Sequence, residues 1–191
     1  MPRIVETIVT TTDAAGHPHI APLGLIEGEG GGWIVAPFRP SRTLDNLMAV
    51  PFAVASHTDD VRVFAGSITG RRDWPLIAAD KVKGVRLAEA LSHSELKVQR
   101  LDDDEKRPRF HCAIVHQATH APFEGFNRAQ AAVLECAVLV TRLDMLPAEK
   151  VEAELKYLEI AIGKTAGERE LVAWAWLMER ISAWRAERAA G

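Results

Sequence analysis

The chain has 191 residues, of which 48% are hydrophobic and 26% are charged, and its formal net charge at pH 7 is −3. This length and composition suit a globular protein with a sizeable core, and they exclude a disordered chain. The nearly balanced charge gives no general attraction to nucleic acid or to an anionic membrane, so we expect neither as a partner.

The two cysteines, Cys112 and Cys136, both stand among apolar residues. They form neither a disulfide framework nor a CxxC metal clamp, so burial as small hydrophobic side chains is the simpler interpretation. Residues 1–12 lack the basic region and apolar core of a signal peptide, and no apolar run approaches the ~20 residues of a membrane span. We therefore predict a cytoplasmic protein.

The first part of the chain has the β-branched residues and turns of antiparallel hairpins. Residues 4–12 and 19–26 predict two strands, and Pro22 places part of the second at an edge or a bulge because it removes a ladder donor. The glycine run at 28–32 is followed by another predicted strand, residues 33–38. A phosphate loop would require a helix there, so we interpret the run as a hairpin turn.

The middle of the chain contains both helix-like and strand-like patterns of apolar residues. A short helix is predicted within residues 39–51, because its apolar residues are spaced i, i+3, i+4 and Ser41 is a plausible N-cap. Further strands are expected at residues 52–57, 61–65, 95–101 and 110–117, and a helix is considered for residues 80–91.

From Asn127 onward the apolar residues recur with a helical period, which predicts three helices. The last of them carries three tryptophans. Trp174 and Trp176 lie two residues apart and so point to different sides of that helix, which leaves one side for a partner. The predicted fold is mainly β with α: a β-domain over residues 1–122 followed by a helical domain over residues 123–191.

Side-chain catalysis has no clear candidate. The sequence contains no G-x-S-x-G nucleophile elbow, and pairing any two carboxylates as acid and base would be arbitrary. Metal-ligating residue types occur at His111, His116 and His120, with Cys112 and Cys136 nearby. On a strand His116 and Cys112 share a face that His111 does not, so these ligands do not converge and we predict no metal site.

One segment does suggest an anion site. Two guanidinium groups, two hydroxyls and an amide fall at a predicted helix start, in Arg39, Ser41, Arg42, Thr43 and Asn46. Arginine offers forked donors to phosphate oxygens, and a helix N-terminus adds backbone N–H groups and a positive dipole end. The alternative is an ordinary solvated strand-to-helix cap.

A second segment, residues 123–129, places aromatic rings, an amide and a cation at the mouth of the next helix. Asn127 is a good N-cap, and Arg128 is either a binding residue or a surface charge.

Together these stretches resemble the FMN-binding split barrels, and more closely the domain-of-unknown-function 447 family. The resemblance covers most of the chain and rests on residues 16–24, on residues 41–47, and on residues 126–129 continuing to 134–135 and 141–143. It implies FMN bound at a homodimer interface, with Ser41, Thr43 and Asn46 near the ribityl phosphate and Asn127 and Arg128 closing the pocket. His19 stands where relatives are expected to carry a smaller amide.

Three functions are compatible with these observations. The favoured one is an FMN-dependent oxidoreductase that acts on a small molecule or on another flavin or pterin, with the flavin carrying the redox chemistry. Barrel residues Ile20, Leu23, Trp33 and Phe38 are candidates for the apolar slot of its ring. The alternatives are a non-catalytic flavin carrier or sensor, and an inert barrel that carries a helical dimerisation module. The sequence identifies neither substrate nor electron donor.

Overall fold

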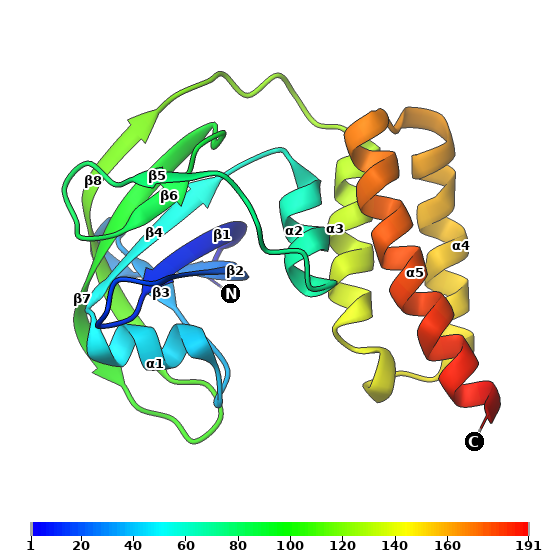
Figure 1. The fold of residues 1–191 in the computed structure, drawn as a ribbon, viewed down its shortest axis with the longest axis horizontal. Helices are drawn as coiled ribbons and strands as arrows, with labels where there is room; N and C mark the ends of the chain where they lie inside the picture. The colour runs from blue at the N-terminus through cyan, green and yellow to red at the C-terminus, as the bar shows by residue number, and fades with distance from the viewer. Residues whose placement is uncertain (1, 191) are drawn as a thin grey trace. The chain divides into compact units, whose positions relative to one another are not determined.

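The structure is a computed structural model that describes residues 2–190, and it divides into two compact units. The first, here called the barrel unit, runs up to Thr58 and resumes over Trp74–Phe123. The second, the helical unit, consists of Asp59–Asp73 and the residues from Glu124 onward. Each unit has its own hydrophobic core, and Figure 1 shows the elements of both.

The barrel unit is a closed barrel of antiparallel strands in the order β1-β2-β3-β8-β7-β4. Its strands are β1 (Ile4–Thr12), β2 (Pro18–Glu27), β3 (Trp33–Val35), β4 (Phe52–His57), β7 (Ser92–Asp102) and β8 (Arg109–Thr119). The short β3 pairs with β2 only at Ile26 and Glu27, so Pro22 lies where β2 pairs with β1 alone. The edge position expected for Pro22 is therefore confirmed.

Two local features shape this barrel. The glycine run forms the predicted connection from β2 to β3 through the 3-10 turn η1 (Glu29–Gly31), in which Gly30 and Gly31 have positive φ angles of 72° and 84°. The predicted short helix is α1 (Arg42–Ala49), which inserts Leu44 and Leu47 into the barrel core and lies beneath the strands in Figure 1. Burial of this apolar helix face holds the N-terminus of α1 against the barrel.

The helix considered for residues 80–91 is absent. Residues 85–87 instead form a strand, β6 (Val85–Leu87), which a turn joins to β5 (Leu76–Ala78) in a separate two-stranded sheet. The turn's N–H groups bond to a distant carboxylate: Asp80, Lys81 and Val82 all donate to Glu95 of β7, at 2.6–2.8 Å. Hydrogen bonds to residues far along the chain thus override the local helical pattern.

The helical unit contains α2 (Val61–Ile68), α3 (Arg128–Val140), the 3-10 turn η2 (Leu143–Met145), α4 (Ala148–Thr165) and α5 (Glu168–Ala190). The three C-terminal helices are confirmed, but the strand expected at residues 61–65 is wrong, because these residues belong to α2. Asp60 caps this helix by accepting a hydrogen bond from the Arg62 N–H, and Val61 and Ala65 pack into the helical core. Helix packing outweighs the β-propensity of the valines.

The tryptophans of α5 all contact their own unit. Trp184 is buried, whereas Trp174 and Trp176 are half-buried and pack against the helical core. The guanidinium of Arg71 also covers the Trp176 ring, at 4.8 Å from its centroid. Both Trp174 and Trp176 thus contact the helical core and are also partly exposed, and the expectation that one of them faces a partner stays a prediction.

Candidate functional site

The first turn of α1 presents backbone donors. Ser41 is the N-cap, as predicted: its hydroxyl oxygen accepts a hydrogen bond from the Leu44 N–H at 3.3 Å, and its carbonyl accepts one from the Asp45 N–H at 3.1 Å. The N–H groups of Arg42 and Thr43 come before these and have no acceptor within the helix. They lie at the positive end of the helix dipole, which favours an anion.

The two arginines beside this turn differ in their contacts. Arg39 donates a hydrogen bond to Asp103 at 2.8 Å, and its backbone N–H bonds to the Lys106 carbonyl. Arg42 is exposed and is the first residue of the helix. Arg39 is thus paired with Asp103, whereas Arg42 stands at the helix start itself; which of them contacts an anion stays a prediction.

Two further predicted residues meet at Thr11 of β1. The Asn46 amide donates a hydrogen bond to the Thr11 hydroxyl at 3.0 Å, and Thr11 is the cross-strand partner of His19. Because directly opposed residues of antiparallel strands share a face, His19 and Asn46 lie beside the same threonine. Thr43 and Asn46 are buried, and His19 is half-buried. The structure thus gathers six predicted residues into one region: His19, Arg39, Ser41, Arg42, Thr43 and Asn46.

The remaining two predicted residues belong to the helical unit. The carbonyl oxygen of the Asn127 side chain accepts hydrogen bonds from the N–H groups of Ala129 and Gln130, and its amide nitrogen donates to the Thr165 carbonyl. Asn127 is therefore the N-cap of α3, as predicted. Arg128 is the exposed first residue of that helix. Their role toward a flavin stays a prediction.

The four residues considered for an apolar slot do not share one surface. Leu23 and Trp33 pack against the barrel core, whereas Ile20 lies on the opposite face of β2 because side chains alternate along a strand. Phe38 is 63% exposed and stacks against the Arg107 guanidinium. The prediction that these four residues line one apolar slot is therefore wrong.

An open groove of about 990 Å³ adjoins Trp33 in the barrel unit. Its walls include the glycine turn and the polar side chains of Arg100, Arg109 and His111. The indole N–H of Trp33 is buried and has no hydrogen-bond acceptor among residues 2–190. A buried donor without a partner is costly, so a ligand acceptor that reached this N–H would stabilise the complex.

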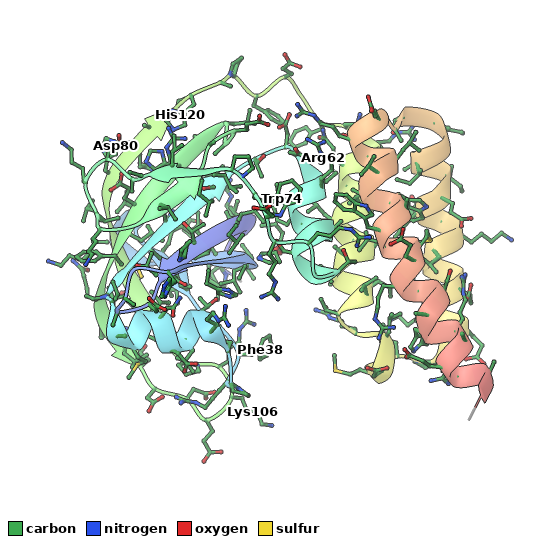
Figure 2. The ribbon with its side chains drawn as sticks, in the orientation of Figure 1. Phe38, Arg62, Trp74, Asp80, Lys106 and His120 are labelled. Atoms are coloured by element: carbon green, nitrogen blue, oxygen red, sulfur yellow. The ribbon has the colours of Figure 1, made fainter. Side chains whose placement is uncertain are left out.

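A second polar cluster lies at the other end of the barrel unit. Figure 2 shows Asp80 and His120 at the end opposite Phe38 and Lys106. Asp80 stands here with His93, Glu95 and His116. Burial opposes ionisation of Glu95, but hydrogen bonds from the backbone N–H groups of Val82, Asp80 and Lys81 and from His93 outweigh it and hold the pKa of Glu95 below its usual value.

Comparison with known families covers nearly the whole chain. A family model described as the N-terminal domain of the protein of unknown function DUF447 matches residues 5–121, and a second DUF447 model matches residues 127–179. An FMN-bound DUF447 protein from Methanosarcina mazei superposes with a TM-score of 0.78 at 22% identity, over 94% of this chain and 96% of that one. No curated protein matches the sequence.

More distant structures share the barrel. A 2-nitrobenzoate 2-nitroreductase from Pseudomonas fluorescens is 18% identical, with a TM-score of 0.53 over 63% of this chain and 66% of that one. An NADH:FAD oxidoreductase from Streptomyces globisporus is 14% identical, with a TM-score of 0.51 over 60% and 75%. The predicted split barrel with a helical segment is confirmed. Within residues 2–190, no helix has the length and apolar content to cross a membrane.

Proposed function

This chain belongs to the DUF447 family, and from that premise we propose that it binds FMN in the barrel unit, with the phosphate at the start of α1. The observation that carries the proposal is the first turn of α1. Two N–H groups without helical acceptors, from Arg42 and Thr43, stand beside the Ser41 hydroxyl and an exposed guanidinium. The FMN-bound relative from Methanosarcina mazei supports the choice of ligand.

The residues at the start of α1 fit the phosphate of this cofactor, and the groove beside Trp33 is the place we propose for its ring. Backbone N–H groups and arginine are the usual donors to a phosphate dianion. The groove beside Trp33 adds volume and an indole N–H that lacks an acceptor within the described part of the chain. Bound FMN would supply hydride or electron transfer, and the protein's own task is then to hold the phosphate and to admit the substrate.

The activity we propose is an FMN-dependent oxidoreduction of a small molecule. Two kinds of support exist: the more distant relatives include a nitroreductase and an NADH:FAD oxidoreductase, and the sequence offers no catalytic side-chain set of its own. A flavin carrier or sensor without turnover is the second candidate. An inert barrel that serves helical dimerisation is the third.

The absorbance spectrum of the purified protein, recorded before and after addition of NADH or NADPH, tests these alternatives. We expect a flavin spectrum, release of FMN and not FAD on heating, and bleaching by a reduced nicotinamide. A colourless protein that also ignores added FMN in a fluorescence titration would overturn the flavin proposal. Bound FMN that neither nicotinamide reduces would favour the carrier.

We further propose that the working unit is a cytoplasmic homodimer. Closed two-fold dimers are the commonest oligomers. The helical unit also exposes large apolar side chains, at Tyr157, Ile160 and Leu171, that a second copy could cover. Light scattering at micromolar concentration decides the matter, because a mass near the 21.0 kDa of one chain with FMN still bound would contradict the dimer.

A further inference from the structure

Four side chains with metal-ligating atoms converge in the barrel unit. One of them, Asp80, is labelled in Figure 2 and lies at the end of the barrel away from α1. Asp80 comes from the turn between β5 and β6, His93 and Glu95 from β7, and His116 from β8. Their ligand atoms all lie within 4.8 Å of one another. The strand alternation places His93 and Glu95 on one face, and the β7–β8 pairing sets His116 directly opposite Glu95.

The separations within this cluster are longer than those of a short charge-assisted hydrogen bond. The His93 Nε2 atom lies 3.2 Å from a Glu95 oxygen and 3.4 Å from an Asp80 oxygen, and His116 Nε2 lies 3.4 Å from the same Asp80 oxygen. Charge-assisted hydrogen bonds are typically about 2.7–2.9 Å long. In a tetrahedral zinc site, ligands about 2.0–2.1 Å from the metal lie about 3.3 Å from each other. These three separations, 3.2–3.4 Å, are close to the second value, and all four ligand atoms lie within 4.8 Å of one another.

Another histidine–carboxylate pair, between His111 of β8 and Asp102 of β7, provides the contrast. His111 Nε2 lies 2.7 Å from an Asp102 oxygen, the distance of an ordinary hydrogen bond. In the cluster, two carboxylate oxygens approach the single Nε2 atom of His93, and one Nε2 proton cannot bond well to both. A cation among the four groups would satisfy all of these lone pairs together.

Additional hydrogen bonds fix the orientation of two of the proposed ligand side chains, Glu95 and His93. Three backbone N–H groups bond to the Glu95 carboxylate, which fixes its orientation and leaves a lone pair directed toward His93. The other ring nitrogen of His93, Nδ1, lies 2.9 Å from Nε2 of His120. Metal-bound histidines and carboxylates usually have such second hydrogen bonds, which set the tautomer and the ring orientation.

We propose that Asp80, His93, Glu95 and His116 bind one divalent transition-metal ion, with zinc the best match to two imidazoles and two carboxylates. His93 and Glu95 are buried, whereas the Asp80 side chain is 51% exposed and gives the ion an entry path. Four protein ligands make a closed site, which is the pattern of structural zinc. The ion ties the β5–β6 turn to β7 and β8.

This site differs from the set weighed in the sequence. There, His111, His116, His120 and the two cysteines failed to converge, and of these only His116 is a ligand here. His93 and Glu95 meet His116 through the β7–β8 pairing, and Asp80 reaches the cluster from the turn between β5 and β6. The expectation of no metal site was thus based on a different group of residues from the one proposed here.

The test uses full-length protein without a histidine tag. Metal is measured by elemental mass spectrometry as purified, and then by calorimetric titration of the chelator-stripped protein with zinc chloride. We expect one zinc per chain and a rise in melting temperature on zinc addition. His116→Gln should weaken zinc binding by about tenfold or more. His111→Gln, which breaks the ordinary His–Asp pair of similar exposure on the same strand, should leave it unchanged.

Asp80→Asn provides a second variant at an exposed position, where misfolding is not expected, and it should also lower zinc affinity. Circular dichroism verifies that each variant is folded. The proposal is overturned if wild-type protein neither retains metal nor takes up zinc in a saturable way near one equivalent. It is equally overturned if folded His116→Gln and Asp80→Asn bind zinc as tightly as His111→Gln. Loss of zinc from both, with retention in the control, supports the four-ligand site.

Discussion

The two units of this protein bury different kinds of side chain. Among the described residues, ten buried polar or charged side chains lie in the barrel unit and three in the helical unit. The barrel set includes threonines of β1, Thr43 and Asn46 of α1, and His93 and Glu95 of β7. The helical core instead consists of aliphatic residues, Cys136 and Trp184. Both proposed binding sites therefore draw on the barrel's buried polar groups.

Polar and apolar burial contribute differently to the stability of the two units. A buried polar group stabilises a fold only when its hydrogen bonds are made, and it costs about 1–3 kcal/mol when they are not. The barrel satisfies such groups through non-local contacts, for example Asn46 with Thr11 and Glu95 with the turn at Asp80. The helical unit is stabilised mainly by apolar burial, which tolerates exchange of one hydrophobic residue for another. Function is therefore expected to be more sensitive to substitutions in the barrel.

The largest expected effect comes from opening a cavity in each core. Phe110 in the barrel is 1% exposed and Trp184 in the helical unit is 2% exposed, so alanine at either position should cost about 3–5 kcal/mol of unfolding free energy. We expect Phe110→Ala to lose FMN as well, because the barrel holds the proposed site. Trp184→Ala should bind FMN normally at temperatures where it stays folded. Urea denaturation and flavin fluorescence provide the two measurements, and equal loss of FMN in both variants would contradict the functional contrast.

The next largest effect uses one cysteine in each unit. Burial raises the pKa of Cys112 in the barrel and of Cys136 in α3 to about 12, so neither thiol should react with iodoacetamide until its surroundings open. FMN at 100 times its Kd should slow the alkylation of Cys112 about 100-fold, because ligand binding suppresses opening of the barrel. Mass spectrometry of the labelled peptides gives both rates. Equal protection of Cys136 would mean that the two units open as one.

Removal of the exposed arginine at the start of α1 should have a smaller effect. A charge-assisted hydrogen bond contributes about 1.5–3 kcal/mol, so Arg42→Ala should weaken FMN binding by about tenfold or more. Riboflavin lacks the phosphate and should be affected much less. Arg185→Ala, in an exposed ion pair with Glu152 of the helical unit, is the control and should leave both affinities unchanged. Equal losses for FMN and riboflavin would show that α1 does not bind phosphate.

The secondary structure was predicted correctly where the hydrophobic pattern of a segment matches its burial in the fold. The helical period of α3, α4 and α5 and the β-branched strands β1 and β2 were evident because one face or both faces are buried regularly. Prediction failed at α2, whose valines favour a strand until the helical core is considered, although Asp60 was a readable N-cap. It failed again at residues 80–91, where Glu95 determines the turn from a distance.

Site residues could be predicted from the sequence only where they lie close together along the chain. The α1 segment is continuous in sequence, so its hydroxyls and arginines could be named together. The metal-ligating cluster combines three separate segments, and its only local signal is the alternation of His93 and Glu95 on one strand. Its convergence depends on the register between β7 and β8, which includes shifts next to Glu95 and Val98 that pattern alone does not predict.

The smallest effects should separate two neighbouring residues of the helical unit. Asn127 caps α3 with hydrogen bonds to Ala129 and Gln130 and also bonds to Thr165, so Asn127→Ala should cost about 0.5–2 kcal/mol of stability with or without FMN. Arg128 is exposed, and Arg128→Ala should leave the melting temperature of the flavin-free protein nearly unchanged.

If Arg128 contacts the flavin, as the resemblance implies, its removal should still lower FMN affinity, because a cation that meets an anionic ligand contributes to binding alone. Thermal melts of the flavin-free proteins and fluorescence titrations with FMN separate these two roles. The control is Arg169→Ala, which removes an exposed arginine from the start of α5 and should alter neither quantity. If the flavin-free Arg128→Ala protein melts as early as Asn127→Ala, then Arg128 is a structural residue and the helical unit contributes stability without contacting the cofactor through this side chain.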